Sequence, residues 1–144
     1  MKLKTVQFGT IDVAEDRIID MPAGMPGFPD RKQFVVLALP RTHPFLWYQS
    51  VSDPNLAFSI INPWLFVHDY VLDTRPVIDE MGWAREEETS LEVYAIVNVT
   101  KKQADEITAN LMGPLVINPT RREAVQFIVY NSPYSHIHPV FRRN

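Results

Sequence analysis

The sequence predicts an all-β fold, a compact antiparallel β-barrel-like single domain over residues 1–144 that includes one or two very short helices. Short runs of β-branched and aromatic residues recur along the chain, and twelve prolines fall mostly between them. No segment has the length of a crossover helix, and no linker or repeat divides the chain. Many short strands without such helices favour a barrel or sandwich over an α/β fold.

Nine runs are expected to form strands. In chain order they are Leu3–Phe8, Arg17–Met21, Gln33–Leu39, Phe45–Ser50, Leu56–Ile61, Phe66–Leu72, Leu91–Thr100, Leu115–Ile117 and Ala124–Tyr130. In residues 91–99 an aliphatic side chain occupies every odd position, so one face of this strand is expected to be buried. The third and fifth runs are almost continuously apolar, which is typical of central strands covered on both faces.

Two short helices are expected. Pro76–Met81 has a proline in its first turn and Gly82 placed to end it. Lys101–Ile107 follows Thr100, which has Gln103 three residues further on, the spacing of a capping box. Neither helix exceeds about two turns, so strands are expected to dominate the fold.

Composition excludes several classes of function. The chain has no cysteine, which excludes disulfides, thiolate metal sites and cysteine nucleophiles. Its net charge of −3 does not favour direct contact with a phosphate backbone. No apolar run approaches the roughly 18 residues of a membrane span, and the N-terminus lacks a secretion signal. A cytoplasmic protein without a membrane or nucleic-acid partner is therefore expected.

The acidic residues are unevenly distributed. Nine of them lie between Ser50 and Val99, where only two arginines occur, whereas four arginines follow residue 120. Such a cluster is either a solvated surface or a face that steers the approach of a basic protein. The candidate residues for this face are Asp79, Glu80, Glu86, Glu87 and Glu88.

No arrangement of residues predicts catalysis. His136 and His138 would share one face of a strand but lack a further ligand nearby in sequence. The serines lack the glycine-flanked elbow of a hydrolase, and no glycine-rich phosphate loop is present. We therefore expect no catalytic residue, no metal and no cofactor. Direct binding of RNA or a small ligand is the alternative function for a small barrel, but the aromatic and basic residues do not coincide.

The segment from Met21 to Pro29 combines three prolines, two glycines and three large apolar side chains. Such a loop either closes the end of a barrel or offers an apolar contact surface. Phe28 is the candidate for a buried position. Met21 and Met25 are the better candidates for exposure.

Four ordered motifs make the chain similar to the FliW family of flagellar assembly factors. They are Phe8-Gly9-Thr10-Ile11, Gly24-Met25-Pro26-Gly27-Phe28, Pro44-Phe45-Leu46-Trp47-Tyr48-Gln49-Ser50 and the segment from Thr108 to Asn118. Together they extend over nearly the whole chain. Met25 and Tyr48 each stand where the family pattern has leucine.

The resemblance implies a small β-barrel that is not an enzyme and that has two protein partners. These are flagellin, bound near its C-terminal segment in a chaperone-like complex, and the translational repressor CsrA. The two partners exclude one another. Export of flagellin would free the factor to bind and antagonise CsrA, which relieves the repression of flagellin synthesis in the cytoplasm.

The expected partner surface comprises Met25, Tyr48, Asn55 and the acidic residues named above. The remaining motif residues either form turns and core or contribute to the interface. They are Phe8, Gly9, Gly24, Gly27, Phe28, Pro44, Phe45, Trp47, Gln49, Asn110 and Pro114.

Overall fold

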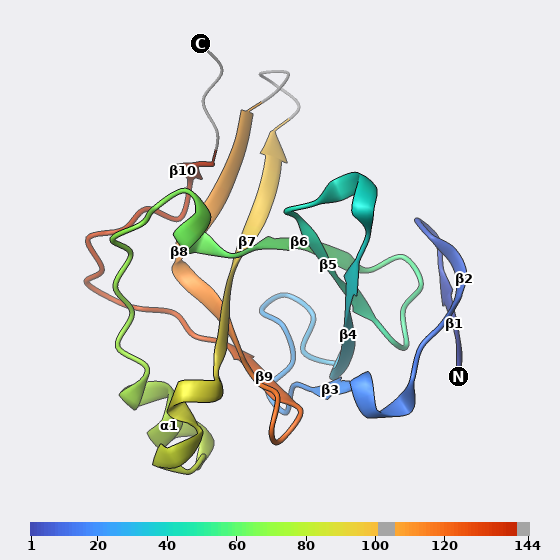
Figure 1. The fold of residues 1–144 in the computed structure, drawn as a ribbon, viewed down its shortest axis with the longest axis horizontal. Coiled ribbons are helices and arrows are strands. Elements are labelled where there is room, and N and C mark those ends of the chain that lie inside the picture. Colours follow the sequence, from blue (N-terminus) through green and yellow to red (C-terminus); the bar gives the residue numbers. More distant parts are fainter. Residues whose placement is uncertain (101–105, 141–144) are drawn as a thin grey trace.

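A computed structural model describes residues 1–100 and 106–140 (Figure 1). Its strands are β1 (Lys2–Thr5), β2 (Gly9–Asp12), β3 (Ile19–Asp20), β4 (Gln33–Ala38), β5 (Leu46–Ser50), β6 (Ala57–Ile61), β7 (Glu92–Thr100), β8 (Glu106–Asn118), β9 (Glu123–Gln126) and β10 (His138–Pro139). The α-helix is α1 (Arg75–Met81). Single 3₁₀ turns occur at Glu15–Arg17, Pro40–Thr42 and Pro63–Leu65, and a six-residue 3₁₀ segment at Arg85–Ser90.

Seven strands form a closed ring in the order β8, β7, β6, β5, β4, β3, β9, because β9 pairs again with β8. The predicted all-β barrel is therefore confirmed. One pairing departs from the antiparallel prediction, since β3 and β9 run parallel where Asp20 lies opposite Glu123. Strand β10 extends the sheet beyond β8, and β1 and β2 form a separate hairpin beside the ring (Figure 1).

Strand β8 closes the ring because it changes direction at a bulge. The pairing with β7 jumps from Ile96 opposite Asn110 to Tyr94 opposite Leu115, so residues 111–114 lie outside the regular register. The Asn110 Oδ1 accepts hydrogen bonds from the backbone N–H groups of Met112 and Gly113, at 3.0 and 2.8 Å. The predicted strand Leu115–Ile117 was thus only the last part of a strand of 13 residues.

The interior of the ring holds the largest buried side chains. The rings of Phe34 and Tyr48 stack at a centroid distance of 4.4 Å, and both side chains are fully buried. Met21 and Met25 belong to the same cluster, at 1% and 2% exposure. The loop that carries them lies within the outline of the ring in Figure 1, drawn in light blue after β3.

The expected exposure of this loop was wrong in both directions. Met21 and Met25 are buried, whereas Phe28 is 41% exposed and its ring lies 6.0 Å from that of Phe58. Two backbone hydrogen bonds, Gly24 N–H to Met21 O and Phe28 N–H to Met25 O, fold the loop into consecutive turns. These turns direct both methionines toward the core, so the Phe28 ring is left on the outside.

Strand β7 is covered on both faces, although its alternation predicted a single buried face. Tyr94 and Ile96 pack against the interior cluster. The odd positions, Val93, Ala95 and Val97, belong to or pack against a second cluster on the outer face of the ring. This outer layer contains residues 66–72, which were predicted to be a strand but are irregular.

Four predicted strands are confirmed as β4, β5, β6 and β7, and α1 confirms the predicted helix Pro76–Met81, which Gly82 ends at φ 68°. The prediction Leu3–Phe8 was too long, because β1 ends in a turn and β2 follows it. Arg17–Met21 was also too long, since only Ile19–Asp20 pair. Ala124–Tyr130 contains the last three of the four residues of β9, but residues 127–130 are irregular. Residues 101–105 of the predicted helix Lys101–Ile107 lie outside the described residues, and Glu106 and Ile107 begin β8.

Candidate functional site

The histidines do not converge on a site. Among residues 1–100 and 106–140, no group of three or more histidines, aspartates and glutamates could hold a metal ion. His136 is exposed, while the His138 ring lies 5.8 Å from the ring of Phe66. Within the same residues, none of the helices is long and apolar enough to cross a membrane.

Two residues expected at the partner surface lie inside the barrel. Met25 is 2% exposed and Tyr48 is fully buried, so neither side chain reaches a partner in this structure. The Tyr48 hydroxyl has no hydrogen-bond partner in the structure, and burial raises its pKa. Both residues stand where the family pattern has leucine, which is consistent with a role in filling the core.

Gln49 and Asn55 have different roles at the turn between β5 and β6. The buried Gln49 Nε2 lies 3.1–3.2 Å from the backbone oxygens of Ser50, Asp53 and Leu56, to which it donates. The turn is held further by a 3.1 Å ion pair between Arg31 and Asp53. Asn55 is exposed on this turn, so it is the one uncharged residue of the expected partner surface that remains accessible.

Most of the other motif residues are used by the fold. Phe8 packs on Trp47 at a ring distance of 5.4 Å, and the Trp47 indole N–H donates to Thr42 Oγ1 at 3.2 Å. Phe45 packs against the outer cluster. Gly9 begins β2, Gly24 is buried in the loop after β3, Pro44 follows a cis peptide bond, Asn110 holds the bulge and Pro114 is buried within it.

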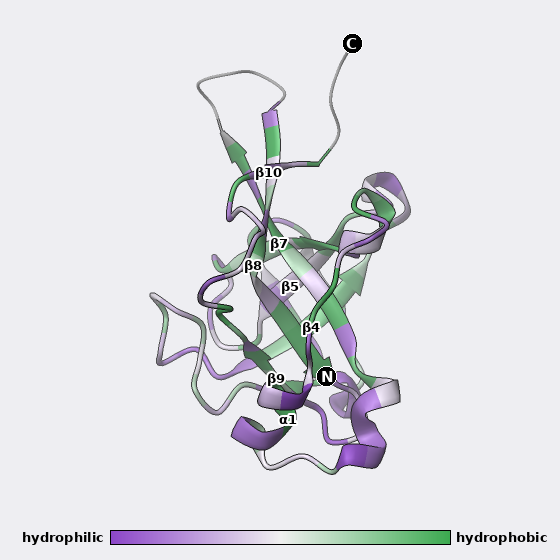
Figure 2. Ribbon diagram, turned by 90° about the vertical axis from the view of Figure 1, so that its left-hand side faces the viewer, coloured by the Kyte–Doolittle hydropathy of each residue, from purple (hydrophilic) through white to green (hydrophobic). Residues whose placement is uncertain are grey.

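The acidic residues gather on α1 and on the 3₁₀ turn Arg85–Ser90, which we call the acidic flank. Asp79, Glu80, Glu86 and Glu88 are exposed there. The flank is fixed to the barrel by the buried Trp83, whose indole N–H donates to Glu123 Oε1 at 2.8 Å. Figure 2 shows hydrophilic residues at the end of the molecule that carries α1. The structure thus places four of the five predicted acidic residues in exposed positions on two adjacent elements, which also carry the exposed Arg75 and Arg85.

Glu87 differs from its acidic neighbours because its carboxylate is engaged within the chain. It accepts from the Ala84 backbone N–H at 2.8 Å and from Arg121 Nε at 2.8 Å. Asn118 also donates to it, at 3.2 Å. The Ala84 hydrogen bond, followed by the contacts with Arg121 and Asn118, lowers the pKa of Glu87. Glu87 therefore fastens the flank to the turn between β8 and β9.

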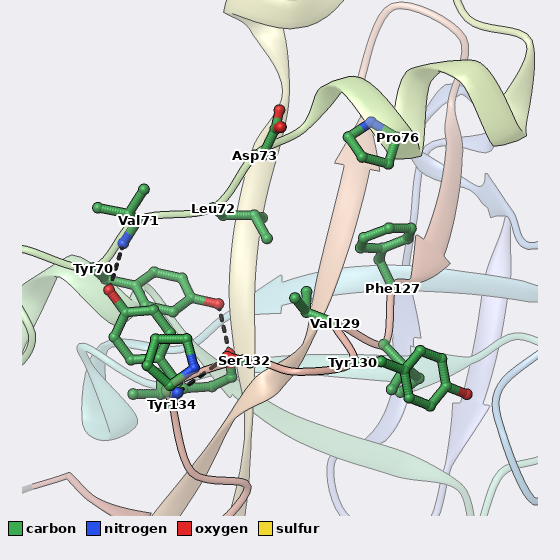
Figure 3. A pocket seen from close by; sticks show the side chains of 13 residues that line it. Tyr70, Val71, Leu72, Asp73, Pro76, Phe127, Val129, Tyr130, Ser132 and Tyr134 are labelled. Atoms are coloured by element: carbon green, nitrogen blue, oxygen red, sulfur yellow. Dashed lines mark hydrogen bonds between the residues drawn. The ribbon is translucent and has the colours of Figure 1, made fainter.

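An aromatic hollow that sequence reasoning missed lies between residues 70–76 and 127–134 (Figure 3). Its volume is about 360 Å³. The Tyr70 hydroxyl donates to Leu111 O at 2.7 Å, and the Tyr134 hydroxyl accepts from Val71 N–H at 2.9 Å. Burial and the proximity of Tyr134 raise the pKa of Tyr70 to about 12. These tyrosines fasten the irregular segment 66–72 to the sheet. The predicted strands had included only residues 70–72 and 127–130 of the two lining segments.

Comparison with known proteins gives a consistent result. The family model described as FliW protein matches residues 2–140. The curated flagellar assembly factor FliW of Moorella thermoacetica is 32% identical over 144 residues, which cover 100% of this chain and 90% of that protein. The factor of the same name from Alkaliphilus metalliredigens is 38% identical over 136 residues, covering 93% and 82%.

The fold agrees with these relatives. A crystal structure of the flagellar assembly factor FliW superposes with a TM-score of 0.87 at 34% identity, and the match covers 99% of this chain and 98% of that one. The matched residues include all four motifs, from Phe8 in the first hairpin to Asn118 at the end of β8. By sequence and by fold, the chain belongs to the FliW family of flagellar assembly factors.

Proposed function

We propose that this chain is a non-enzymatic flagellar assembly factor of the cytoplasm that binds flagellin as a chaperone-like partner. When it is free of flagellin, it binds CsrA and antagonises the repression of flagellin synthesis. Family membership supports the role in assembly. The observation that supports a regulatory protein partner is the acidic flank.

The acidic flank suits a basic partner. Four exposed carboxylates stand on two short consecutive helical elements, and Trp83 and Glu87 hold these elements against the barrel. The same two elements also carry the exposed Arg75 and Arg85, so the carboxylates leave an excess of negative charge. Such an excess steers the association of an oppositely charged surface and raises its rate. The resemblance implies that CsrA is a repressor that binds RNA, and a protein that binds RNA carries basic residues for the phosphate backbone. We therefore assign the flank to CsrA rather than to flagellin.

Calorimetric titration tests the proposal as a whole. Purified flagellin and purified CsrA are each titrated into the full chain, and CsrA is then titrated into the chain saturated with flagellin. We expect heat of binding in the first two experiments and none in the third. Binding of flagellin alone would leave only the chaperone role, and binding of neither partner would overturn the proposal.

A double variant, Glu86→Lys with Glu88→Lys, tests the assignment of the flank. We expect CsrA to associate roughly tenfold more slowly at low salt, with a smaller dependence on salt, because the steering charge is reversed. The free energy of unfolding should change by less than about 0.5 kcal/mol, because both residues are exposed. Glu87 is left in place because it supports the fold.

The matched control reverses two exposed acids outside the flank, Asp16→Lys with Asp30→Lys. It changes the net charge by the same amount and should retain most of the association rate. Equal slowing by both double variants would mean that net charge, and not the flank, governs the encounter.

A further inference from the structure

A groove crosses the outer face of the barrel over four adjacent strands. Trp47 of β5, Ser59 of β6 and Val97 of β7 lie directly opposite one another in the register, and Ala109 of β8 continues the row. Ser59 has a small side chain between two larger ones. A hollow of about 340 Å³ lies over it, which we call the outer groove. It is lined by Arg41, Thr42, His43, Phe45, Trp47, Ser59, Val97, Val99 and Ile107.

One wall of the outer groove is an open strand edge. Strand β6 pairs with β7 only from Ser59 opposite Val97 to Ile61 opposite Ala95. Strand β7 continues to Thr100 and is paired there with β8 on its other side (Figure 1). Among residues 1–100 and 106–140, no strand pairs with residues 98–100 along the edge that faced β6.

This edge can accept another strand. Successive residues of a strand direct their N–H and C=O groups alternately to the two neighbouring strands, so three consecutive residues present at least one such pair to the open side. The Val99 side chain beside this edge is 60% exposed. Main-chain groups next to an apolar hollow are the arrangement by which a sheet binds an extended peptide.

Arg41 is the one formally charged residue among the described residues that line the outer groove. Arg41 and His43 are exposed at its rim, and the lining residues include no aspartate or glutamate. No ion pair joins Arg41 to another residue in the described part of the chain. The rim therefore complements a carboxylate, in contrast to the acidic flank.

We propose that the outer groove binds an extended, acidic segment of a protein partner, which adds as a strand beside residues 98–100. An apolar side chain of that segment lies over Ser59, between Trp47 and Val97, and a carboxylate faces Arg41. The inference rests on the proposed function only in that the segment belongs to a protein partner. The aromatic hollow of Figure 3 is not the site, because its two tyrosine hydroxyls already bind backbone groups of this chain.

The direct test is a titration of the ¹⁵N-labelled full chain with blocked pentapeptides, followed by NMR. One peptide alternates valine with glutamate, and the control peptide alternates valine with lysine. We expect the first to shift the Trp47 indole signal and the amide signals of residues 97–99 to saturation, and the second to shift them little. Equal effects of both peptides, shifts elsewhere only, or no shifts at all would overturn the proposal.

Two variants sharpen the test. Ser59→Arg fills the floor of the groove and should abolish the shifts, whereas Ser90→Arg, an exposed serine on the acidic flank, should leave them unchanged. Arg41→Glu should weaken binding of the glutamate peptide about two- to fivefold, the range of an exposed ion pair, and improve binding of the lysine peptide. Because Arg41 is exposed, this second variant remains informative if Ser59→Arg does not fold.

The same variants separate this inference from the proposed function. If the wild-type chain binds flagellin or CsrA and Ser59→Arg, shown to be folded, binds both equally well, the groove assignment is wrong and the proposed function stands. If the wild-type chain binds neither protein, the proposed function is wrong, and the peptide titration still decides the groove. Loss of one partner only in Ser59→Arg would support the groove and identify which partner occupies it.

Discussion

The loop Met21–Pro29 and the acidic flank are both non-strand segments that were expected to contact partners, yet the fold uses them in opposite ways. The loop turns two methionines into the barrel and leaves Phe28 outside. The flank buries Val77, Ile78 and Trp83 and presents its carboxylates to solvent. The comparison teaches that family motifs in this chain mainly build the barrel, although Phe28 of the second motif is exposed and Phe45 and Trp47 of the third line the outer groove.

The largest effect is expected from the centre of the barrel. Tyr48→Ala should lower the free energy of unfolding by about 3–5 kcal/mol, because it removes a fully buried ring stacked on Phe34. Tyr48→Phe, the control, should change it by less than about 1 kcal/mol, because the lost hydroxyl has no hydrogen-bond partner among the described residues. Urea denaturation measures both values. A large decrease in the free energy of unfolding of Tyr48→Phe would show that the hydroxyl does form a hydrogen bond.

The next effect tests how the loop is folded. Gly24 has a φ of +69°, and a Cβ there would lie 2.6 Å from the backbone oxygen of Pro29. Gly24→Ala should therefore lower the free energy of unfolding by about 2–5 kcal/mol, because it adds backbone strain and a clash with Pro29. Gly27 also has a positive φ, but a Cβ would meet nothing within 4 Å. Gly27→Ala should lower the free energy of unfolding by only about 1–2 kcal/mol. Equal denaturation midpoints for Gly24→Ala and Gly27→Ala would contradict the close approach of Gly24 to Pro29.

A third experiment contrasts the two sides of the same loop. Met25→Ala should lower the free energy of unfolding by about 2–3 kcal/mol, since the side chain fills the interior. Phe28→Ala should cost about 1 kcal/mol, because its ring is half exposed. Thermal denaturation of the two variants would show this order. A larger loss of stability in Phe28→Ala than in Met25→Ala would instead support the sequence-based expectation that Phe28 is buried.

The smallest effect concerns the attachment of the acidic flank. The pKa of Glu87 is lower in the folded chain than its ordinary value of 4.5. The stability it contributes is therefore complete above about pH 4.5 and is lost as the pH falls through the lower, folded-state pKa. Glu87→Gln should melt below the wild type at about pH 7, and the difference should close toward about pH 3. A difference that is independent of pH would mean that the carboxylate charge does not hold the flank.

Glu88→Gln is the matched control for this pH series. Glu88 is exposed on the same 3₁₀ turn as Glu87. Its variant should melt close to the wild type at both ends of the range, because exposed charges contribute little to stability. A decrease as large as that of Glu87→Gln would show that the whole flank, rather than the Glu87 contacts, responds to charge.

Local sequence patterns were sufficient to predict strands whose neighbours in the sheet are the preceding and the following strand of the chain. Strands β4, β5 and β6 follow one another as hairpins, and their apolar runs predicted them closely. The helix α1 was predicted from Pro76 and Gly82. By contrast, β8 was predicted at less than a third of its length, because its bulge depends on β7, on the segments after β9 and on the Asn110 side chain.

The candidate site shows the same division. Composition alone predicted an acidic cluster, and Asp79, Glu80, Glu86 and Glu88 are exposed as expected. The separate role of Glu87 could not be predicted, because Arg121 and Asn118 are more than 30 residues away in the sequence. The outer groove was missed for the same reason, since each strand contributes only one or two residues to it.

By itself, the sequence determined that this chain forms a β-barrel, that it has no cysteine chemistry and that it resembles the FliW family. The alternation of apolar residues, the prolines between the strands and the family motifs are all local properties of the sequence. Only the tertiary structure decided which side chains are buried and which are exposed. Met25 and Phe28 are three residues apart and similarly apolar, yet only one of them is buried. Burial depends on how the loop is turned against strands distant in sequence, and the pattern of the loop alone does not contain that information.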